Sequence, residues 1–316
     1  MKIGLDIMGG DHAPAEAIKG VQSYFEQMPD APVHVLLIGD PDAAAPYLPL
    51  IEKYSHRYTF VEAREVIGMH EHPTKALKEK PGSSIAVGFG MMQKGMADAF
   101  ISAGNTGAML VGAMYSVKAI EGVLRPTIAA PIPRIDGKFS CLLDAGINAD
   151  CKPEHMVQFA QLGSIYSHHV LGVESPKVGL MNIGEEEGKG NILAQATYPL
   201  LKEASGINFA GNIEGRDVFY DKVDVIVCEG FVGNVIIKMA ESVYDILKVQ
   251  RGVQDDFLDT FNFETYGGTP VLGINSPVII GHGISHAPAF CNMIQLASKF
   301  IETDLIGMFK KHFKQA

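Results

Sequence analysis

Five short glycine-bearing segments of the sequence could bind a small anion, because each follows an apolar run that is typical of a buried strand. They are MGGDHAP at 8–14, SAGNTG at 102–107, NIGEEEGKG at 182–190, EGFVGN at 229–234 and GHGIS at 281–285. Loops of this kind expose backbone N–H groups, which bind phosphate and other oxyanions. The chemistry that these segments indicate is the binding of a small anionic substrate.

The segment 102–107 is the first candidate for a phosphate site. Its backbone N–H groups would open a helix after Gly104, and Ser102, Asn105 and Thr106 add side-chain donors. The alternative is that the glycines form a tight turn and that Thr106 caps the helix. This one motif does not separate the two hypotheses.

Two further side chains are candidates for stabilising charge at a reacting centre. Lys189 stands between two glycines, which exposes its ammonium group to a small anion, and Asn234 ends a glycine turn before a predicted helix. The alternatives are a solvated charged loop for the lysine and an ordinary helix N-cap for the asparagine. The other candidates, expected to bind substrate or to shape the binding loops, are Gly9, Gly10, Asp11, Glu185 and His282.

Several common classes of site lack their sequence signature. Neither G-x-x-x-x-G-K-[ST] nor a G-x-G-x-x-G that opens a first helix occurs, which disfavours a P-loop nucleotidase and a Rossmann dehydrogenase. No cluster of histidines, cysteines or carboxylates has a convincing metal-ligand spacing, so we expect neither a metal nor a cofactor. The four cysteines are also too widely spaced for a disulfide framework, which favours a reducing cytoplasm.

The composition places the chain among globular proteins. It has 316 residues, of which 47% are hydrophobic and 20% are charged. The 26 basic and 36 acidic residues give a net charge of −10, which disfavours a nucleic-acid-binding surface. Asp6 and Asp11 interrupt the apolar N-terminal residues, so we expect no signal peptide and a cytoplasmic protein.

Short β-branched runs alternate with segments of helical period along most of the chain, which predicts a mostly parallel sheet covered by helices on both faces. Two pairs of strands, over 127–146 around Asp136-Gly137 and over 269–283, predict antiparallel hairpins and a mixed sheet. A stripe of apolar residues from Phe290 to Phe313 predicts one last helix. We expect a single domain over residues 1–316, which could comprise two interleaved halves.

Taken together and in this order, the motifs strongly resemble the bacterial phosphate acyltransferase family PlsX. To the five loops above, the resemblance adds RP at 125–126 and NFAGNIEG at 208–215, and it extends from Ile3 to about Ala297. It implies a three-layer α/β/α fold similar to isopropylmalate dehydrogenase and phosphotransacetylase. Glu229 stands where the family pattern has aspartate.

The resemblance also implies a function. A member of this family moves a long-chain fatty acyl group from acyl carrier protein to inorganic phosphate, and the acyl phosphate product serves phospholipid synthesis. The implied partners are acyl carrier protein, phosphate, a second copy of the chain in a homodimer, and the membrane glycerol-3-phosphate acyltransferase that uses the product. The protein would be cytoplasmic, with peripheral association to the membrane as a further option.

Three other functions remain open on the sequence. A phosphotransacetylase-like enzyme would use acyl-CoA in place of acyl carrier protein. A dehydrogenase of the same general fold would need a nicotinamide cofactor and a divalent metal ion. A binding module would only recognise an acyl chain or phosphate, without chemistry.

The implied reaction suits the candidate residues. Phosphate is already an anionic nucleophile at neutral pH, and a thiol leaving group has a pKa of about 8.5, so positioning and charge stabilisation suffice. We therefore expect the loop 102–106 to bind phosphate. We expect Lys189 and Asn234 to stabilise charge on the thioester oxygen or on the phosphate.

Two segments are candidates for contact with other molecules. The segment 247–263 carries an apolar stripe of Val253, Phe257, Leu258 and Phe261, and in the family it resembles a projecting helical element that serves dimerisation and membrane contact. Aspartates flank the stripe and oppose an anionic leaflet, so we expect it to bury mainly against the partner subunit. The C-terminal cluster that could dock an acidic carrier protein, or else only complement the helix dipole, is Lys310, Lys311, His312 and Lys314.

Overall fold

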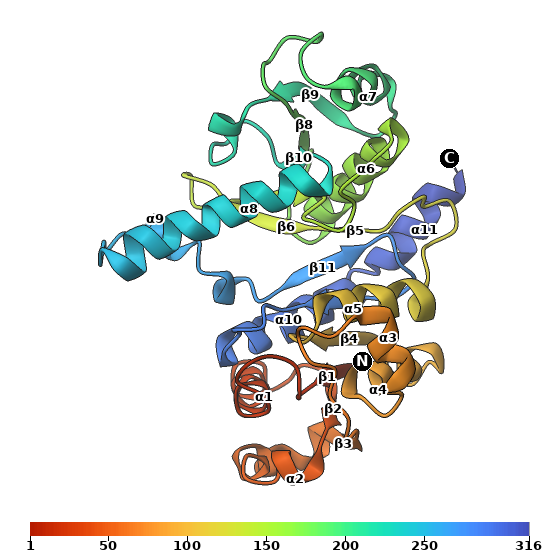
Figure 1. Cartoon of the computed structure of the whole chain (residues 1–316), viewed down its shortest axis with the longest axis vertical. Helices are drawn as coiled ribbons and strands as arrows, with labels where there is room; N and C mark the ends of the chain where they lie inside the picture. The colour runs from red at the N-terminus through yellow and green to blue at the C-terminus, as the bar shows by residue number, and fades with distance from the viewer. Residues whose placement is uncertain (316) are drawn as a thin grey trace. The chain divides into compact units, whose positions relative to one another are not determined.

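The computed structural model describes residues 1–315 and contains two compact units, each assembled from segments distant in the sequence (Figure 1). Unit 1 comprises Met1–Ile120 and Phe263–Ile306, and unit 2 comprises Glu121–Asn262 and the residues from Gly307 onward. The expectation of a single domain over residues 1–316 stays a prediction.

The sheet of unit 1 is parallel except at its last strand. Its strands lie in the order β3 (Tyr58–Glu62), β2 (His34–Gly39), β1 (Lys2–Asp6), β4 (Ala99–Ser102), β12 (Val278–Ile280) and β11 (Thr269–Leu272). Only β11 runs antiparallel to its neighbour β12. The predicted hairpin over 269–283 is therefore confirmed.

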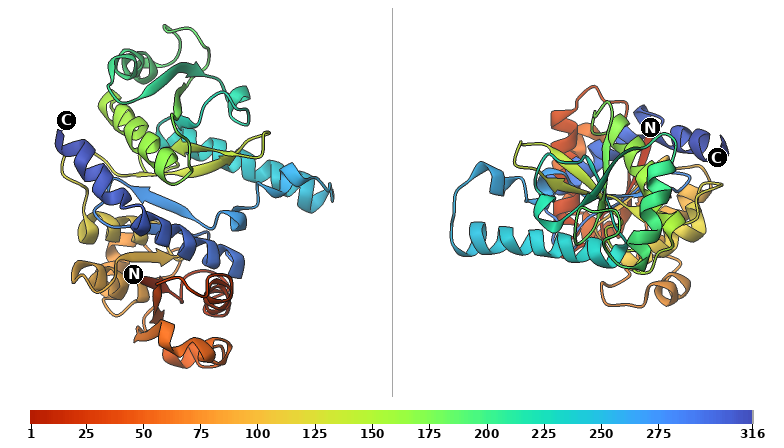
Figure 2. Two further views of the ribbon diagram at one scale, coloured as in Figure 1. Left: turned by 180° about the vertical axis from the view of Figure 1, so that it is seen from behind. Right: turned by 90° about the horizontal axis from the view of Figure 1, so that it is seen from above.

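Helices cover both faces of this sheet, because its side chains alternate between two apolar layers. Ile3 and Leu5 point into a core shared with α1 (Ala15–Gln27) and α10 (Ala287–Glu302), and α10 lies across the sheet in the view from behind (Figure 2). On the other face the ring of Phe89, in α4 (Ser84–Gln93), lies 5.0 Å from the ring of Phe100. The remaining α-helices of unit 1 are α2 (Pro41–Ala44), α3 (Pro73–Glu79) and α5 (Thr106–Gly112). Unit 1 also contains 3₁₀ or π segments at Leu48–Arg57, Ala113–Val117 and Phe263–Thr265.

Unit 2 has a smaller mixed sheet. Its strands lie in the order β6 (Ala130–Pro133), β7 (Phe139–Leu143), β10 (Val225–Val227), β8 (Lys177–Met181) and β9 (Asn208–Ile213). The two-residue strand β5 (Thr127–Ile128) precedes β6 in the chain and is not a strand of this sheet. Strands β6 and β7 are antiparallel, and Gly137 turns between them with φ of +79°, which confirms the predicted hairpin. The other strand pairs are parallel.

Helices also cover both faces of the unit 2 sheet. One face packs against α6 (Pro153–His169) and α7 (Ile192–Glu203). On the other face Leu142 and Ile226 share a core with Ile236 and Ile237 of α8 (Gly230–Tyr244). The predicted three-layer α/β/α fold with mixed, mostly parallel sheets is confirmed.

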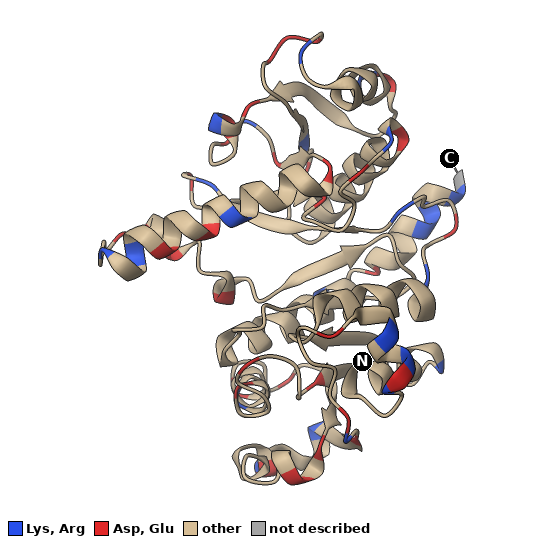
Figure 3. Cartoon of the chain, in the orientation of Figure 1, with Lys and Arg blue, Asp and Glu red and all other residues tan. Residues whose placement is uncertain are grey.

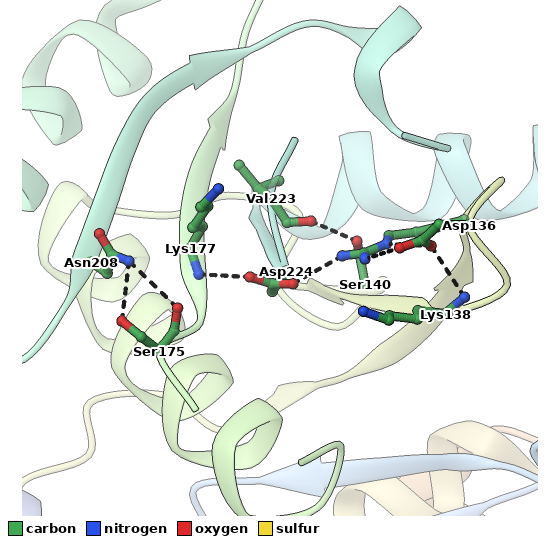
Figure 4. Close-up of polar contacts among 9 residues, drawn as sticks. Asp136, Lys138, Ser140, Ser175, Lys177, Asn208, Val223 and Asp224 are labelled. Carbon is green, nitrogen blue, oxygen red and sulfur yellow. Dashed lines mark hydrogen bonds and ion pairs between the residues drawn. The ribbon is translucent and has the colours of Figure 1, made fainter. Parts of the chain in front are cut away.

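A buried arginine joins the strands of unit 2 at the edge of the sheet where β7, β8 and β10 begin. The Arg134 side chain is 5% exposed, and its guanidinium donates to Asp136 at 3.0 and 2.5 Å and to Asp224 at 2.9 Å. Asp224 in turn accepts the backbone N–H of Lys177 at 2.9 Å (Figure 4). This network links the hairpin to β8 and to the residue before β10.

Two predicted helices differ from the structure. The last helix is broken, because Asp304 has φ of +48°, so α10 ends at Glu302 and a separate helix, α11 (Leu305–Gln315), follows. The segment PDAAAPYLPLIEKY at 41–54, whose period predicts one helix, forms a four-residue α2 followed by a 3₁₀ segment, Leu48–Arg57, which contains a kink at Tyr54.

The expectation for the stripe at 247–263 is wrong for two of its residues. The helix α8 continues as a π segment, Asp245–Gln250, and is followed by the short α9 (Asp256–Asp259). Leu258 and Phe261 are buried within unit 2 itself, and the ring of Phe261 lies 5.3 Å from that of Phe219. Within residues 1–315, no helix combines the length and the apolar character needed to cross a bilayer.

Candidate functional site

Three loops of unit 1 meet at one edge of its sheet. Strands β1, β4 and β12 are parallel neighbours, so the segments after their carboxyl ends must lie side by side. The backbone N–H of Asp11 donates to the carbonyl of Gly283 at 2.7 Å, and Gly10 has φ of +97°, a conformation that favours glycine. The predicted loops at 8–14, 102–107 and 281–285 are therefore brought together.

Asp6, which the sequence motifs did not identify, holds two of these loops. Its carboxylate is buried and accepts the hydroxyl of Ser102 at 2.7 Å and the backbone N–H of Met8 at 2.9 Å. The Ser102 hydroxyl oxygen accepts the N–H of Gly104 at 2.9 Å. A methyl group on Gly9 would lie 2.6 Å from the nitrogen of Gly104, so no larger residue fits there without movement. The only signal in the sequence is a charged residue at the end of an apolar run.

Burial raises the pKa of Asp6, and hydrogen bonds from Ser84 and Ser102 oppose part of this effect. A desolvated carboxylate is unfavourable for folding, and such groups concentrate at functional sites. Through its bonds to Ser102 and Met8, Asp6 fixes the geometry of the two glycine loops.

Two of the predicted phosphate ligands in this region point inward. Ser102 is buried, and its hydroxyl proton is donated to Asp6. Asn105 is 4% exposed, and its Oδ1 caps α5 by accepting the N–H of Ala108 at 2.9 Å. Its Nδ2 lies within 3.2 Å of three carbonyl oxygens, those of Gly68, Met69 and Glu71. Among the polar side chains of this loop, only Thr106 is exposed.

Histidine side chains border the same edge of unit 1. The ring of His282 lies 4.5 Å from that of Phe263, and His12 stacks on His286 at the same separation. The Nδ1 of His286 lies 2.8 Å from a carboxylate oxygen of Glu264. The predicted site residues that unit 1 contains are Gly9, Gly10, Asp11, Ser102, Gly104, Asn105, Thr106 and His282.

In unit 2 the loop after β7 lies against the start of α8. The buried carboxylate of Asp144 accepts the backbone N–H groups of Gly146 at 2.8 Å and of Asn148 at 3.0 Å. The N–H of Gly230 donates to the carbonyl of Asn148 at 2.8 Å, and a side chain on Gly233 would overlap the carbonyl of Asp144. Asp144 therefore organises its loop as Asp6 does in unit 1.

Asn234 is not a helix cap, so that alternative is wrong. The cap of α8 is Glu229, whose carboxylate accepts the N–H groups of Phe231 at 2.5 Å and of Val232 at 3.0 Å. Asn234 lies further along α8, exposed, with its Cβ 3.3 Å from the position that a Cβ on Gly146 would occupy. The glutamate at 229 therefore serves as the helix cap, and the amide of the exposed Asn234 lies beside Gly146.

Lys189 is exposed, and within residues 1–315 no carboxylate pairs with its ammonium group. Two glutamates of the same loop form ion pairs, and each pairs with a lysine other than Lys189. Glu185 pairs with Lys222 at 2.6 Å, and Glu187 pairs with Lys202 at 2.7 Å. Unit 2 thus contains the predicted residues Glu185, Lys189 and Asn234, of which Glu185 directs its carboxylate to a lysine of the protein.

Burial disfavours a thiolate at the cysteines. It raises the pKa of Cys141, Cys228 and Cys291, and it raises the pKa of Cys151 to about 12. A thiolate is the reactive form, so these surroundings do not favour a cysteine nucleophile. No group of three or more histidine, cysteine or carboxylate side chains in residues 1–315 could hold a metal ion.

The C-terminal cluster lies on the last helix of the chain. Helix α11 carries Lys310, Lys311 and Lys314, and basic residues are visible along it (Figure 3). Burial lowers the pKa of His312, which disfavours a positive charge on its ring. The role of the three lysines in docking stays a prediction.

Residues 1–308 of the chain match the family described as fatty acid synthesis protein. The phosphate acyltransferase of Desulfitobacterium hafniense is 42% identical over 331 residues, which cover 98% of this chain and 97% of the relative. That of Desulforamulus reducens is 42% identical over 328 residues, with the same coverage.

Among solved structures, a phosphotransacetylase from Streptococcus pyogenes superposes with a TM-score of 0.64 at 14% identity, covering 96% of this chain and 94% of the other. The EutD phosphotransacetylase from Staphylococcus aureus gives 0.61 at 15% identity, covering 95% and 93%. At this level of identity the similarity concerns the fold.

Proposed function

The chain belongs to the phosphate acyltransferase family PlsX, and on that premise we propose that it transfers a long-chain fatty acyl group from acyl carrier protein to inorganic phosphate. An oxygen of phosphate attacks the thioester carbonyl carbon, and a tetrahedral oxyanion forms. The C–S bond then breaks, the thiolate leaves with the electron pair and takes a proton from solvent, and an acyl phosphate remains.

The observation that supports this reaction most directly is the state of Lys189. An exposed ammonium group without a carboxylate partner is available to an anion, and the neighbouring Glu185 and Glu187 are neutralised by other lysines. Lys189 and Asn234 are assigned to stabilise negative charge in the transition state.

The glycine loops of unit 1 are assigned to phosphate. Ser102 and Asn105 hold the loop in place, so contact with phosphate falls to backbone N–H groups and to the exposed Thr106. The N–H of Gly104 is already donated to Ser102. Gly9, Gly10 and Asp11 shape the neighbouring loop, and the bond from Asp11 to Gly283 places His282 at its border.

The proposal also includes partners. Acyl carrier protein is the acyl donor, a second copy of the chain forms a homodimer, and the membrane glycerol-3-phosphate acyltransferase consumes the product. Acyl carrier proteins are acidic, so docking to the lysines of α11 should weaken with salt.

The test is the formation of acyl phosphate, trapped as the hydroxamate, with acyl carrier protein and acyl-CoA compared as donors. We expect activity that requires phosphate and that favours the carrier-protein thioester. Equal or better use of acyl-CoA would make the phosphotransacetylase-like alternative correct. If neither donor gives acyl phosphate, the alternative of a binding module without chemistry would be favoured.

Lys189→Met and Asn234→Ala should each lower kcat by roughly a hundredfold to a thousandfold, as is typical when one oxyanion donor is removed. Lys238→Met is the matched control, because Lys238 is an exposed lysine of α8 that pairs with Glu241 at 2.7 Å. Full activity in both Lys189→Met and Asn234→Ala, with unchanged folding, would refute the assignment of these two residues.

A further inference from the structure

The backbone on both sides of Lys189 is held by the side chain of Gln195. This residue lies in the first turn of α7, and its Nε2 donates to the carbonyl of Gly188 at 3.1 Å and to that of Gly190 at 3.0 Å. Both hydrogens of the amide are thus used, one on each side of the lysine. An exposed glycine-rich loop would otherwise have large conformational freedom.

Two more side-chain amides hold the same loop. Asn182, directly after β8, donates from Nδ2 to the carbonyl of Lys189 itself at 3.0 Å. Asn212, a buried residue of β9, donates from Nδ2 to the carbonyl of Glu186 at 2.9 Å, and that carbonyl also accepts the N–H of Lys189 at 3.1 Å. The backbone N–H and C=O of Lys189 are therefore both bonded.

The stem of the Lys189 side chain is restricted as well. A methyl group on Gly184 would lie 3.0 Å from Cγ and 3.5 Å from Cδ of Lys189, so the stem passes directly over this glycine. Gly190 has φ of +99°, and a side chain there would overlap Oδ1 of Asn182. Gly184 and Gly190 are thus both needed for the placement of the lysine.

We propose that Gln195, together with Asn182, is a positioning residue that holds the Lys189 ammonium group in one place relative to the reacting anion. The inference rests on the proposed role of Lys189 in acyl transfer to phosphate. A charged group that is already in place stabilises the transition state without reorganisation during the reaction. Gln195 acts through the loop backbone and does not itself contact the substrate.

The test replaces Gln195 with methionine, which has a similar length and helix propensity but no donor. Acyl phosphate formation should fall about tenfold in kcat, while KM for the acyl donor changes less than about threefold and the melting temperature stays nearly constant. The matched control is Gln22→Met, because Gln22 is a helical glutamine of unit 1 whose amide donates to the side chain of Glu26. This control should retain full activity.

A double-mutant cycle separates positioning from a general structural role. In a Lys189→Met background, Gln195→Met should cause no further loss, because the group that it positions is gone. An equal loss in both backgrounds would overturn the proposal, and so would full kcat in Gln195→Met. Full activity in Lys189→Met alone would refute the proposed role of Lys189. That outcome is distinct from a failure of the positioning role of Gln195.

Gly184→Ala perturbs the same placement without touching Gln195. Its methyl group would lie 2.9 Å from Oε2 of Glu186 and 3.0 Å from Cγ of Lys189, so both side chains would have to move. The kcat should fall about tenfold here too, again with no added loss in the Lys189→Met background. This variant decides the question if Gln195→Met does not fold. Full activity in a folded Gly184→Ala protein would also count against a fixed position for the ammonium group.

Discussion

Replacing Arg134 with methionine should destabilise unit 2 by about 3 kcal/mol. The guanidinium is 5% exposed and makes three hydrogen bonds to the carboxylates of Asp136 and Asp224, at 2.5 to 3.0 Å. Removing one member of a buried ion pair usually costs about 3–5 kcal/mol, because the remaining charge is left unpaired. The two aspartates retain 30% and 17% exposure and can partly rehydrate, which favours the lower end of that range.

The effect should depend on pH. Arg134 lowers the pKa of Asp136 to about 2, whereas an aspartate in the unfolded chain titrates near 3.9. The carboxylate is partly exposed, so solvent screening reduces its contribution to about 1–2 kcal/mol. A lowered pKa gives stability that is complete above about pH 4 and is lost as the pH falls from about 4 to about 2, and at pH 3 about half of it is gone.

Chemical denaturation from pH 7 to pH 3 measures this difference, and amide hydrogen exchange locates it. Exchange should accelerate in β7 and β10 and remain unchanged in β1 and β2 of unit 1. At neutral pH the loss corresponds to a fall in melting temperature of roughly 6–12 °C for a unit of this size. A gap between wild type and Arg134→Met that stays constant down to pH 3 would show that the Asp136 pair does not contribute as argued.

Two further substitutions test packing at specific positions. Gly9→Ala should destabilise unit 1 by about 1–3 kcal/mol and raise KM for phosphate, because its methyl group would lie 2.6 Å from the nitrogen of Gly104 and 2.7 Å from Oδ2 of Asp6; wild-type stability and KM would mean that the loops do not touch there. Leu258→Ala should cost about 2–4 kcal/mol in urea titrations whatever the protein concentration, since Leu258 is buried within its own chain; a loss that grows on dilution would place this side chain in a subunit interface.

The sequence alone was sufficient to predict the architecture and the approximate location of the candidate site. Alternating β-branched runs and helical segments led to the α/β/α fold, and Asp136-Gly137 marked the hairpin between β6 and β7. The glycine loops at 8–14, 102–107 and 281–285 could be expected to meet, because the carboxyl ends of neighbouring parallel strands share an edge. These inferences depend on hydrophobic periodicity and turn residues, which act locally and do not depend on how the elements pack together.

Only the tertiary structure decided which polar atoms are free to meet a substrate. Ser102 and Asn105 have the residue types of phosphate ligands, but Ser102 bonds to Asp6, 96 residues earlier, and Asn105 bonds to the carbonyls near Gly68. Glu229, and not Asn234, caps helix α8, and Gln195 donates to the backbone carbonyls beside Lys189. A hydrogen-bonding side chain can satisfy a neighbour, the backbone or a ligand. Its choice depends on which groups the packed chain brings within about 3 Å, and local sequence patterns do not contain that distance.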